Sequence, residues 1–299
     1  MELETRELPT RQAPIPAITP AQGADVAPLP VGAAPCPACA GGAEASFVYA
    51  LGKVEARFPN LSVEKEFAQA TGRTETAGKT DTASFHAVLS KPGNRYLARQ
   101  LCWVLTTQGM ETYLLVPRDP TDLQLLIDAI RPAPSPGDID VVIGVRGPVA
   151  SADMCNGLTV PIVAFDQIYS FNRDALLEAI PRPSKTPAKQ FNDAAGEVFD
   201  RILQLTDNAG ATDEHRALGY LAMRYPGIYA KTLEQFGRDF SLTSVDVQRS
   251  PLAGTRNVLD VIFAYTDRKT DFTEKFAVRV DVTEEFPFLV TKLSPYFDR

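Results

Sequence analysis

The stretch Leu259-Asp-Val-Ile-Phe-Ala-Tyr265 places an apolar side chain at every second position, and Phe276-Ala-Val-Arg-Val-Asp-Val282 repeats this pattern after a turn-like segment. An apolar period of two is typical of a strand that buries one face. A third short apolar stretch follows at Phe288–Leu293. Because only short polar segments separate these stretches, they predict a meander of antiparallel strands near the C-terminal end.

The segment before these strands has a helical period. Between Ala188 and Phe236 apolar residues recur every three or four positions, which predicts helices that bury one face. The first helix is expected to align the following side chains on its buried face: Phe191, Ala195, Val198, Ile202 and Leu205. Asp213, Pro226 and Gly237 mark the expected helix boundaries.

The N-terminal half mixes shorter strands and helices. The expected elements are, in order, a strand at Phe47–Leu51, a helix at Ser62–Ala70 capped by Ser62, a helix at Arg95–Trp103, a hairpin from Val104 to Val116 that turns at Gln108-Gly109, a helix from Asp119 to Pro132, and strands at Asp140–Val145 and Val160–Phe165. Separate runs of strands and of helices favour an α+β fold with antiparallel sheets and helices over a doubly wound sheet.

Composition indicates how the chain is divided. Residues 1–35 are rich in proline and alanine and contain almost no aromatic side chains. Such a segment buries too little apolar area to offset the entropy lost on ordering, so we predict a disordered N-terminal arm. We expect residues 36–299 to form the folded domain, with a subdivision near the proline-containing segment 181–187.

Charge and hydropathy narrow the classes of partner. The net charge of −7 and the pI near 5.0 leave no basic field that would attract nucleic acid. No stretch of the sequence reaches the length of about 20 apolar residues that a membrane helix requires. The first residues lack the basic and apolar regions of a signal peptide. We therefore expect a cytoplasmic protein without nucleic-acid or membrane partners.

Four cysteines form the sharpest local pattern. Cys36 and Cys39 have the spacing with which two thiolates chelate one zinc ion, and Cys102 and Cys155 would complete a four-cysteine site. Stable disulfides are rare in a reducing compartment, which favours zinc over disulfides. The residues alone leave three interpretations open: a structural zinc site, unrelated thiols with Cys102 in the core, or a redox pair at Cys36 and Cys39.

No catalytic constellation stands out. The two histidines, His86 and His215, lack the local signature of a catalytic pair or triad. Arg95, Arg99 and Trp103 would share one face of the expected helix and could offer an anion or aromatic contact to a peptide. A solvated edge of a core helix explains the same spacing. We keep these three as candidate peptide-binding residues and assign no catalytic residue.

Seven segments of the chain resemble the C-terminal domain of PatG-type cyanobactin maturation proteases. They are Phe47-Val-Tyr-Ala-Leu-Gly-Lys-Val-Glu-Ala-Arg-Phe58, Asn94-Arg-Tyr-Leu-Ala-Arg-Gln-Leu-Cys-Trp103, Tyr113-Leu-Leu-Val-Pro-Arg-Asp119, Met154-Cys-Asn-Gly157, Phe165-Asp-Gln-Ile-Tyr169, Thr212-Asp-Glu-His-Arg-Ala217 and Val282-Thr-Glu-Glu-Phe-Pro-Phe-Leu-Val-Thr-Lys-Leu-Ser-Pro295. The resemblance spans residues 36–299. It includes all four cysteines and therefore implies that Cys36, Cys39, Cys102 and Cys155 hold a structural zinc ion.

The resemblance also implies work on a ribosomally synthesised and post-translationally modified peptide. The sequence has no protease domain, so no proteolytic residue is carried over, and it is similar to the stand-alone relatives of crocagin biosynthesis. We predict an accessory protein that binds the precursor peptide for partner tailoring enzymes, by adding it as a strand to a sheet edge. The alternatives are an enzyme that transfers protons or closes a ring on the peptide, and an assembly protein without a ligand. An exposed edge also makes a two-fold symmetric homodimer a candidate assembly.

Overall fold

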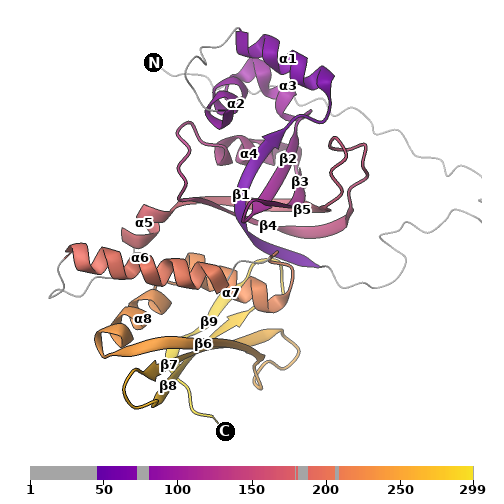
Figure 1. Cartoon of the computed structure of the whole chain (residues 1–299). Helices are drawn as coiled ribbons and strands as arrows, with labels where there is room; N and C mark the ends of the chain where they lie inside the picture. Colours follow the sequence, from indigo (N-terminus) through magenta and orange to yellow (C-terminus); the bar gives the residue numbers. More distant parts are fainter. Residues whose placement is uncertain (1–45, 73–80, 179, 181–187, 206–208, 299) are drawn as a thin grey trace, which may run out of the picture. The chain divides into compact units, whose positions relative to one another are not determined.

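The computed structural model describes residues 46–72, 81–178, 180, 188–205 and 209–298 (Figure 1). All of the described residues belong to one compact unit, Glu44–Arg299. The predicted N-terminal arm lies outside the described residues, as do Cys36, Cys39 and the predicted linker at 181–187.

Five strands of the N-terminal half close into a barrel (Figure 1). They are β1 (Phe47–Arg57), β2 (Cys102–Thr107), β3 (Met110–Pro117), β4 (Asp138–Val149) and β5 (Pro161–Asn172). Their order is β1-β2-β3-β5-β4, and every neighbouring pair is antiparallel except β3 and β5. The expected strands are confirmed. The barrel closure and the parallel pair were not predicted, because neither leaves a local signal in the sequence.

Short helices contribute to the same core as the barrel interior. They are α1 (Leu61–Gly72), α2 (Asp81–Leu89), α3 (Arg95–Ala98) and α4 (Leu123–Ala129), with 3-10 turns at Pro92–Asn94 and Pro120–Asp122. Phe67 of α1 and Ile127 of α4 lie in this core. The helix expected at Ser62–Ala70 is confirmed as α1, which buries Val63, Phe67 and Ala70. Its cap is Asn60 rather than Ser62, since the Oδ1 of Asn60 accepts from the N–H of Val63 at 3.1 Å.

The helix expected at Arg95–Trp103 is wrong beyond its first turn. α3 ends at Ala98, and β2 begins at Cys102. Trp103 pairs with Ala56 of β1, and its indole N–H donates to the carbonyl of Ala98 at 2.9 Å. The helical spacing of the apolar residues is overridden here, because pairing with both β1 and β3 satisfies the backbone of β2 on its two sides.

Longer helices dominate the middle of the sequence. After α5 (Arg173–Glu178) come α6 (Ala188–Leu205), α7 (Asp213–Arg224) and α8 (Gly227–Gly237). The predicted boundaries at Asp213, Pro226 and Gly237 are confirmed; the side chain of Leu205 lies outside the described set. None of the described helices has both the length and the apolar composition needed to cross a lipid bilayer.

The C-terminal strands form a four-stranded antiparallel sheet in the order β6-β7-β8-β9. They are β6 (Phe240–Arg249), β7 (Val258–Asp267), β8 (Thr273–Asp281) and β9 (Phe288–Pro295). One face of the sheet packs against α6–α8 in a second core that includes Phe199, Leu221 and Phe263. The predicted meander is confirmed. The additional strand β6 was not predicted, because it is an edge strand whose many polar residues weaken the apolar period.

The barrel and the C-terminal half meet along β1 and β4. Tyr49 and Leu51 of β1, Val141 and Ile143 of β4, and Met223 of α7 form a buried cluster, which we call the joint cluster. Because side chains alternate along a strand, the intervening residues of β1 face the barrel interior instead. Leu51 of this cluster also lines one cavity, and Tyr49 and Ile143 line another.

Candidate functional site

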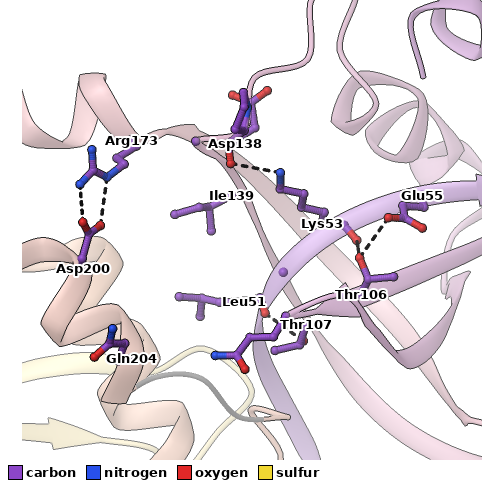
Figure 2. Close-up of a pocket in the computed structure, with 15 residues that line it drawn as sticks. Leu51, Lys53, Glu55, Thr106, Thr107, Asp138, Ile139, Arg173, Asp200 and Gln204 are labelled. Carbon is purple, nitrogen blue, oxygen red and sulfur yellow. Dashed lines mark hydrogen bonds and ion pairs between the residues drawn. The ribbon is translucent and has the colours of Figure 1, made fainter. Parts of the chain in front are cut away.

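A cavity of about 610 Å³ opens where the end of the β2–β3 hairpin, β1 and the start of β4 face helix α6 (Figure 2). Its volume lies in the range of pockets that hold small ligands or a few peptide side chains. Figure 2 shows Leu51 and Ile139 in its middle, the pair Arg173 and Asp200 on one side, and Lys53 on the other. The cavity therefore combines an apolar floor with charged groups at its rim.

The floor exists because β1 and β2 approach each other closely at Gly52. A β-carbon at this position would collide with the carbonyl oxygen of Thr106, so only glycine permits the approach. The hydroxyl of Thr106 donates to the carbonyl of Lys53 at 3.2 Å, and that of Thr107 donates to the carbonyl of Leu51 at 3.1 Å. Both hydroxyls therefore serve the strand pairing, and the register shift between Leu105 and Thr106 lies at the same place.

Lys53 is the cation with spare hydrogen-bonding capacity. Its Nζ donates to the carbonyl of Pro136 at 3.1 Å, and no described carboxylate pairs with it. An ammonium group has three donors, so two remain for a ligand. Arg173 is different, because its guanidinium already binds Asp200 through two contacts of 2.7 and 3.1 Å. Lys53 is thus the group that a ligand carbonyl or carboxylate would meet.

Two carboxylates close to the cavity have structural partners. Asp138 pairs with Arg131 and accepts from the backbone N–H of Ser135 at 2.6 Å. Asp140 is buried, and burial raises its pKa although Ser170 and Val54 donate to it at 2.6 and 2.9 Å and so lower it. These contacts fasten β1, β4 and β5 together. The arrangement suits binding, with an apolar surface for a side chain and Lys53 for a polar group.

The candidate peptide-binding residues named from the sequence do not form one surface. Arg95 and Arg99 are exposed at α3, and Arg95 donates to the side chain of Gln124 at 2.5 Å. Trp103 is 3% exposed and belongs to the core. The three were grouped on a helix face that ends before Trp103, so the structure separates the tryptophan from the two arginines. A role for Arg95 and Arg99 in binding stays a prediction.

The structure brings two of the four cysteines together. Cys102 of β2 and Cys155 are both buried, pair as a disulfide and have Cα atoms 5.8 Å apart. Cys36 and Cys39 lie outside the described residues. Over the described ranges, no group of three or more metal-binding side chains converges. The disulfide joins two residues that are 53 positions apart and differs from the expected pair of zinc-bound thiolates. The zinc ion itself stays a prediction.

The two edges of the C-terminal sheet differ. On β9, the N–H groups of Leu289 and Leu293 donate to the hydroxyls of Tyr220 at 3.2 Å and Tyr225 at 3.0 Å. These tyrosines occupy donors that an added strand would need. β6 pairs with β7 on one side, and no described strand pairs with its other side. Strand addition, expected at an edge of the meander, is therefore better accommodated at β6.

The lining residues of the cavity were not identified from the sequence. Lys53, Ile139 and Asp200 lie far apart along the chain, and each is ordinary in its local context. The arrangement depends on the barrel register and on the packing of α6. The segment from Phe47 to Phe58 was singled out for its resemblance to PatG, and it contains Lys53. That segment was the one available signal.

The comparisons with known proteins agree on one type of domain. Residues 185–296 match the family model described as PatG C-terminal. A solved structure described as a PatG domain of unknown function matches with a TM-score of 0.70 and 19% sequence identity, over 85% of this chain and 99% of that one. The chain carries a PatG C-terminal-type domain. The comparison with curated proteins finds no match.

The two comparisons extend over different lengths of the chain. The family model matches the part of the sequence that forms α6–α8 and the sheet β6–β9. The structural match covers 85% of the chain and so extends into the barrel. At 19% identity it shows a shared fold. The barrel, where most of the cavity lining lies, is thus related to PatG by its fold, while the C-terminal half is also related by sequence.

Proposed function

We propose that this protein binds a precursor peptide in the biosynthesis of a ribosomally synthesised and post-translationally modified peptide. The PatG C-terminal-type domain implies a role in a pathway of cyanobactin type. The single observation that supports peptide binding is the cavity between β1 and α6, with its apolar floor and the spare donors of Lys53.

An extended peptide segment suits the chemistry of this cavity. A leucine-sized side chain buried over Leu51 and Ile139 would contribute about 1.5–3 kcal/mol. Lys53 would bind a peptide carbonyl or an acidic side chain, and the exposed amide of Gln204 offers both a donor and an acceptor. Ordering the peptide offsets part of these gains, so we expect micromolar affinity, about −8 kcal/mol.

The test is a titration of the fluorescently labelled precursor peptide of the pathway against the purified full chain. Lys53→Glu reverses the charge at the rim and is expected to weaken binding at least about tenfold, with a smaller dependence on salt. Lys65→Glu makes the same change on the exposed surface of α1 and should leave the affinity unchanged.

Strand addition at β6 is separated from binding in the cavity by changing the peptide rather than the protein. N-methylation of alternate peptide nitrogens removes the donors of a β ladder and leaves the side chains in place. If β6 is the main site, the methylated peptide binds more weakly by about tenfold or more, and Lys53→Glu has little effect. If the cavity is the main site, Lys53→Glu weakens binding by about tenfold or more, and N-methylation of the peptide has little effect.

Two outcomes would contradict the proposal. Absence of saturable binding up to about 1 mM would remove precursor-peptide binding as the function. A change in the mass of the peptide on incubation with this protein alone would favour the alternative, an enzyme acting on the peptide. Partner tailoring enzymes would be sought by adding them to the protein–peptide complex and measuring whether modification is faster.

We further propose that Cys36, Cys39, Cys102 and Cys155 hold a structural zinc ion. The proposal is supported by the resemblance to PatG-type domains and by the convergence of Cys102 and Cys155, with Cα atoms 5.8 Å apart. Once the disulfide between them is reduced, Cys102 and Cys155 would supply half of a four-cysteine donor set at one buried place. Bound zinc would fasten the segment around Cys36 and Cys39 to the barrel.

A further inference from the structure

A second cavity, of about 380 Å³, lies at the other end of the joint cluster. Along the antiparallel pair β1 and β4, the first cavity adjoins Leu51 and Ile139, and the second adjoins Tyr49 and Ile143. The buried side chain of Met223 belongs to the cluster between them. The second cavity is therefore a site distinct from the first.

Arg224, the last residue of α7, is the cation that lines this cavity. Its guanidinium carbon lies 4.2 Å from the ring centre of Tyr169 and 5.8 Å from that of Phe171. No carboxylate in the described part of the chain forms an ion pair with it. A guanidinium that stacks on a ring with its flat face keeps its in-plane N–H groups available to bind an anion through two parallel hydrogen bonds.

Tyr49 adds a buried hydroxyl that has no hydrogen-bond partner among the described residues. The side chain lines the cavity and is 2% exposed, and its hydroxyl bonds to no described group. Burial raises the pKa of this hydroxyl, and the nearby Arg224 lowers it by less, although the hydroxyl and the guanidinium do not reach hydrogen-bond geometry. The hydroxyl therefore stays protonated and is available to donate. A buried donor of this kind calls for an acceptor from a ligand.

The remaining wall is mostly aromatic and aliphatic. Phe286 is 48% exposed, and Pro287 and Ile143 lie beside it in the lining. Tyr220 packs edge-to-face on Tyr49, with ring centres 6.3 Å apart. A ligand that fills this cavity thus meets one cation, Arg224, and neutral tyrosine hydroxyls next to aromatic and aliphatic surface. The single positive charge of Arg224 matches the single negative charge of a carboxylate. A phosphate dianion would carry one negative charge more than Arg224 neutralises.

We propose that this cavity binds a carboxylate attached to an apolar or aromatic group. Arg224 would hold the carboxylate oxygens, and the Tyr49 hydroxyl would donate to one of them. Phe286 and Pro287 would cover the apolar group. Two sources share this chemistry: the free C-terminus of a peptide that ends in an apolar residue, and the side chain of an aspartate or glutamate within a peptide.

The experiment uses the full chain and three small probes, titrated by ligand-observed NMR to about 10 mM. They are N-acetylphenylalanine, its amide, and N-acetylglutamic acid α-amide. We expect N-acetylphenylalanine to bind at least about tenfold more tightly than its amide, because the amide loses the charge that Arg224 meets. Binding of the glutamate probe would identify a side-chain carboxylate as a source, and its failure would leave the peptide C-terminus.

Three variants test which residues cause the difference in affinity between the acid and its amide. Arg224→Met should reduce the ratio of acid to amide affinity to about one, and Tyr49→Phe should lower it about threefold. Arg249→Met makes the same charge change at an exposed site on β6 and should leave the ratio as in the wild type. Thermal melting of each variant confirms that it is folded. Equal binding of acid and amide to the wild type, or the same loss in Arg224→Met and Arg249→Met, would overturn the proposal.

Discussion

At the scale of single residues, Tyr49 carries a cost in stability. Its hydroxyl is removed from water and bonds to no described group, while its ring packs in the joint cluster. A buried hydroxyl without a partner costs about 1–3 kcal/mol relative to one that is hydrogen-bonded. Phenylalanine would fill the same space without this cost. A polar group kept in such a place is more readily explained by a ligand than by folding.

Tyr49→Phe is therefore expected to raise the free energy of unfolding by about 1 kcal/mol, measured by denaturant titration. Tyr229→Phe is the matched control, because the buried hydroxyl of Tyr229 donates to the carbonyl of Ala222 at 2.8 Å. Its removal should lower the free energy of unfolding by about 1 kcal/mol. If both substitutions destabilise the protein equally, Tyr49 has a partner and its role in the second cavity is contradicted.

Glu285 couples stability to pH. Arg118 contacts Asp166 at 2.5 Å and Glu285 at 3.1 Å. Burial, reinforced by the hydrogen bond and the repulsion from Asp166, raises the pKa of Glu285 from 4.5 to about 7, against the opposing effect of Arg118. The folded state therefore keeps a proton that the unfolded state releases. The resulting stabilisation is present below pH 4.5 and is lost as the pH rises through about 7.

We expect the free energy of unfolding to fall by on the order of 1 kcal/mol between about pH 5 and pH 8, after allowance for solvent screening. Glu285→Gln cannot titrate and should remove this slope. The neighbouring Glu284 is exposed, so Glu284→Gln should keep it. Denaturant titrations at several pH values provide the measurement. A slope that survives in Glu285→Gln would assign it to other groups.

At the scale of elements, the local period of apolar residues predicted the helices and strands whose buried face in the fold is the apolar face of their sequence. The meander from Leu259 to Val282 and the helix α6 bury the faces that their spacing indicates. Prediction failed where distant pairing decides the structure. Trp103 continues a helical pattern but lies in β2, because β1 and β3 pair with it on both sides. The cavity depends on the same long-range pairing, so Lys53 and Asp200 carried no local signal.

The close approach of β1 and β2 at Gly52 offers a test at the scale of elements. In Gly52→Ala the new β-carbon would meet the backbone carbonyl of Thr106, and backbone moves only at a cost. We expect a loss of at least about 2 kcal/mol in the free energy of unfolding, together with weaker peptide binding at the cavity floor. Gly93→Ala is the control, since nothing lies within 4 Å of its added carbon. Similar stability of both variants would show that β1 adjusts easily.

At the scale of the whole molecule, the four cysteines would join segments far apart in the sequence. Cys102 and Cys155 bring β2 next to the loop between β4 and β5. A zinc ion shared with Cys36 and Cys39 would add the segment before β1 to this place. The stability contributed by the zinc site would then require bound metal and reduced thiols. The stability contributed by the hydrophobic cores would require neither.

Protein purified without chelator is expected to contain about one zinc equivalent per chain, measured by elemental analysis. Cys36→Ser should lose the metal and several kcal/mol of stability, because metal binding is coupled to folding. Free thiols counted under denaturing conditions separate the alternatives. Four free thiols with zinc support the site, whereas two free thiols without zinc indicate that the Cys102–Cys155 disulfide is the stable link.

The unequal edges of the C-terminal sheet limit how copies of this chain can associate. Tyrosine hydroxyls occupy β9 donors at Leu289 and Leu293, and β6 is left unpaired on its outer side among the described strands. A chain with one unpaired strand edge can pair with one other chain, and the resulting dimer then has no unpaired edge left. Growth into a fibre requires two such edges on each copy. Edge pairing would therefore stop at a two-fold symmetric dimer, and a peptide bound along β6 would compete with it.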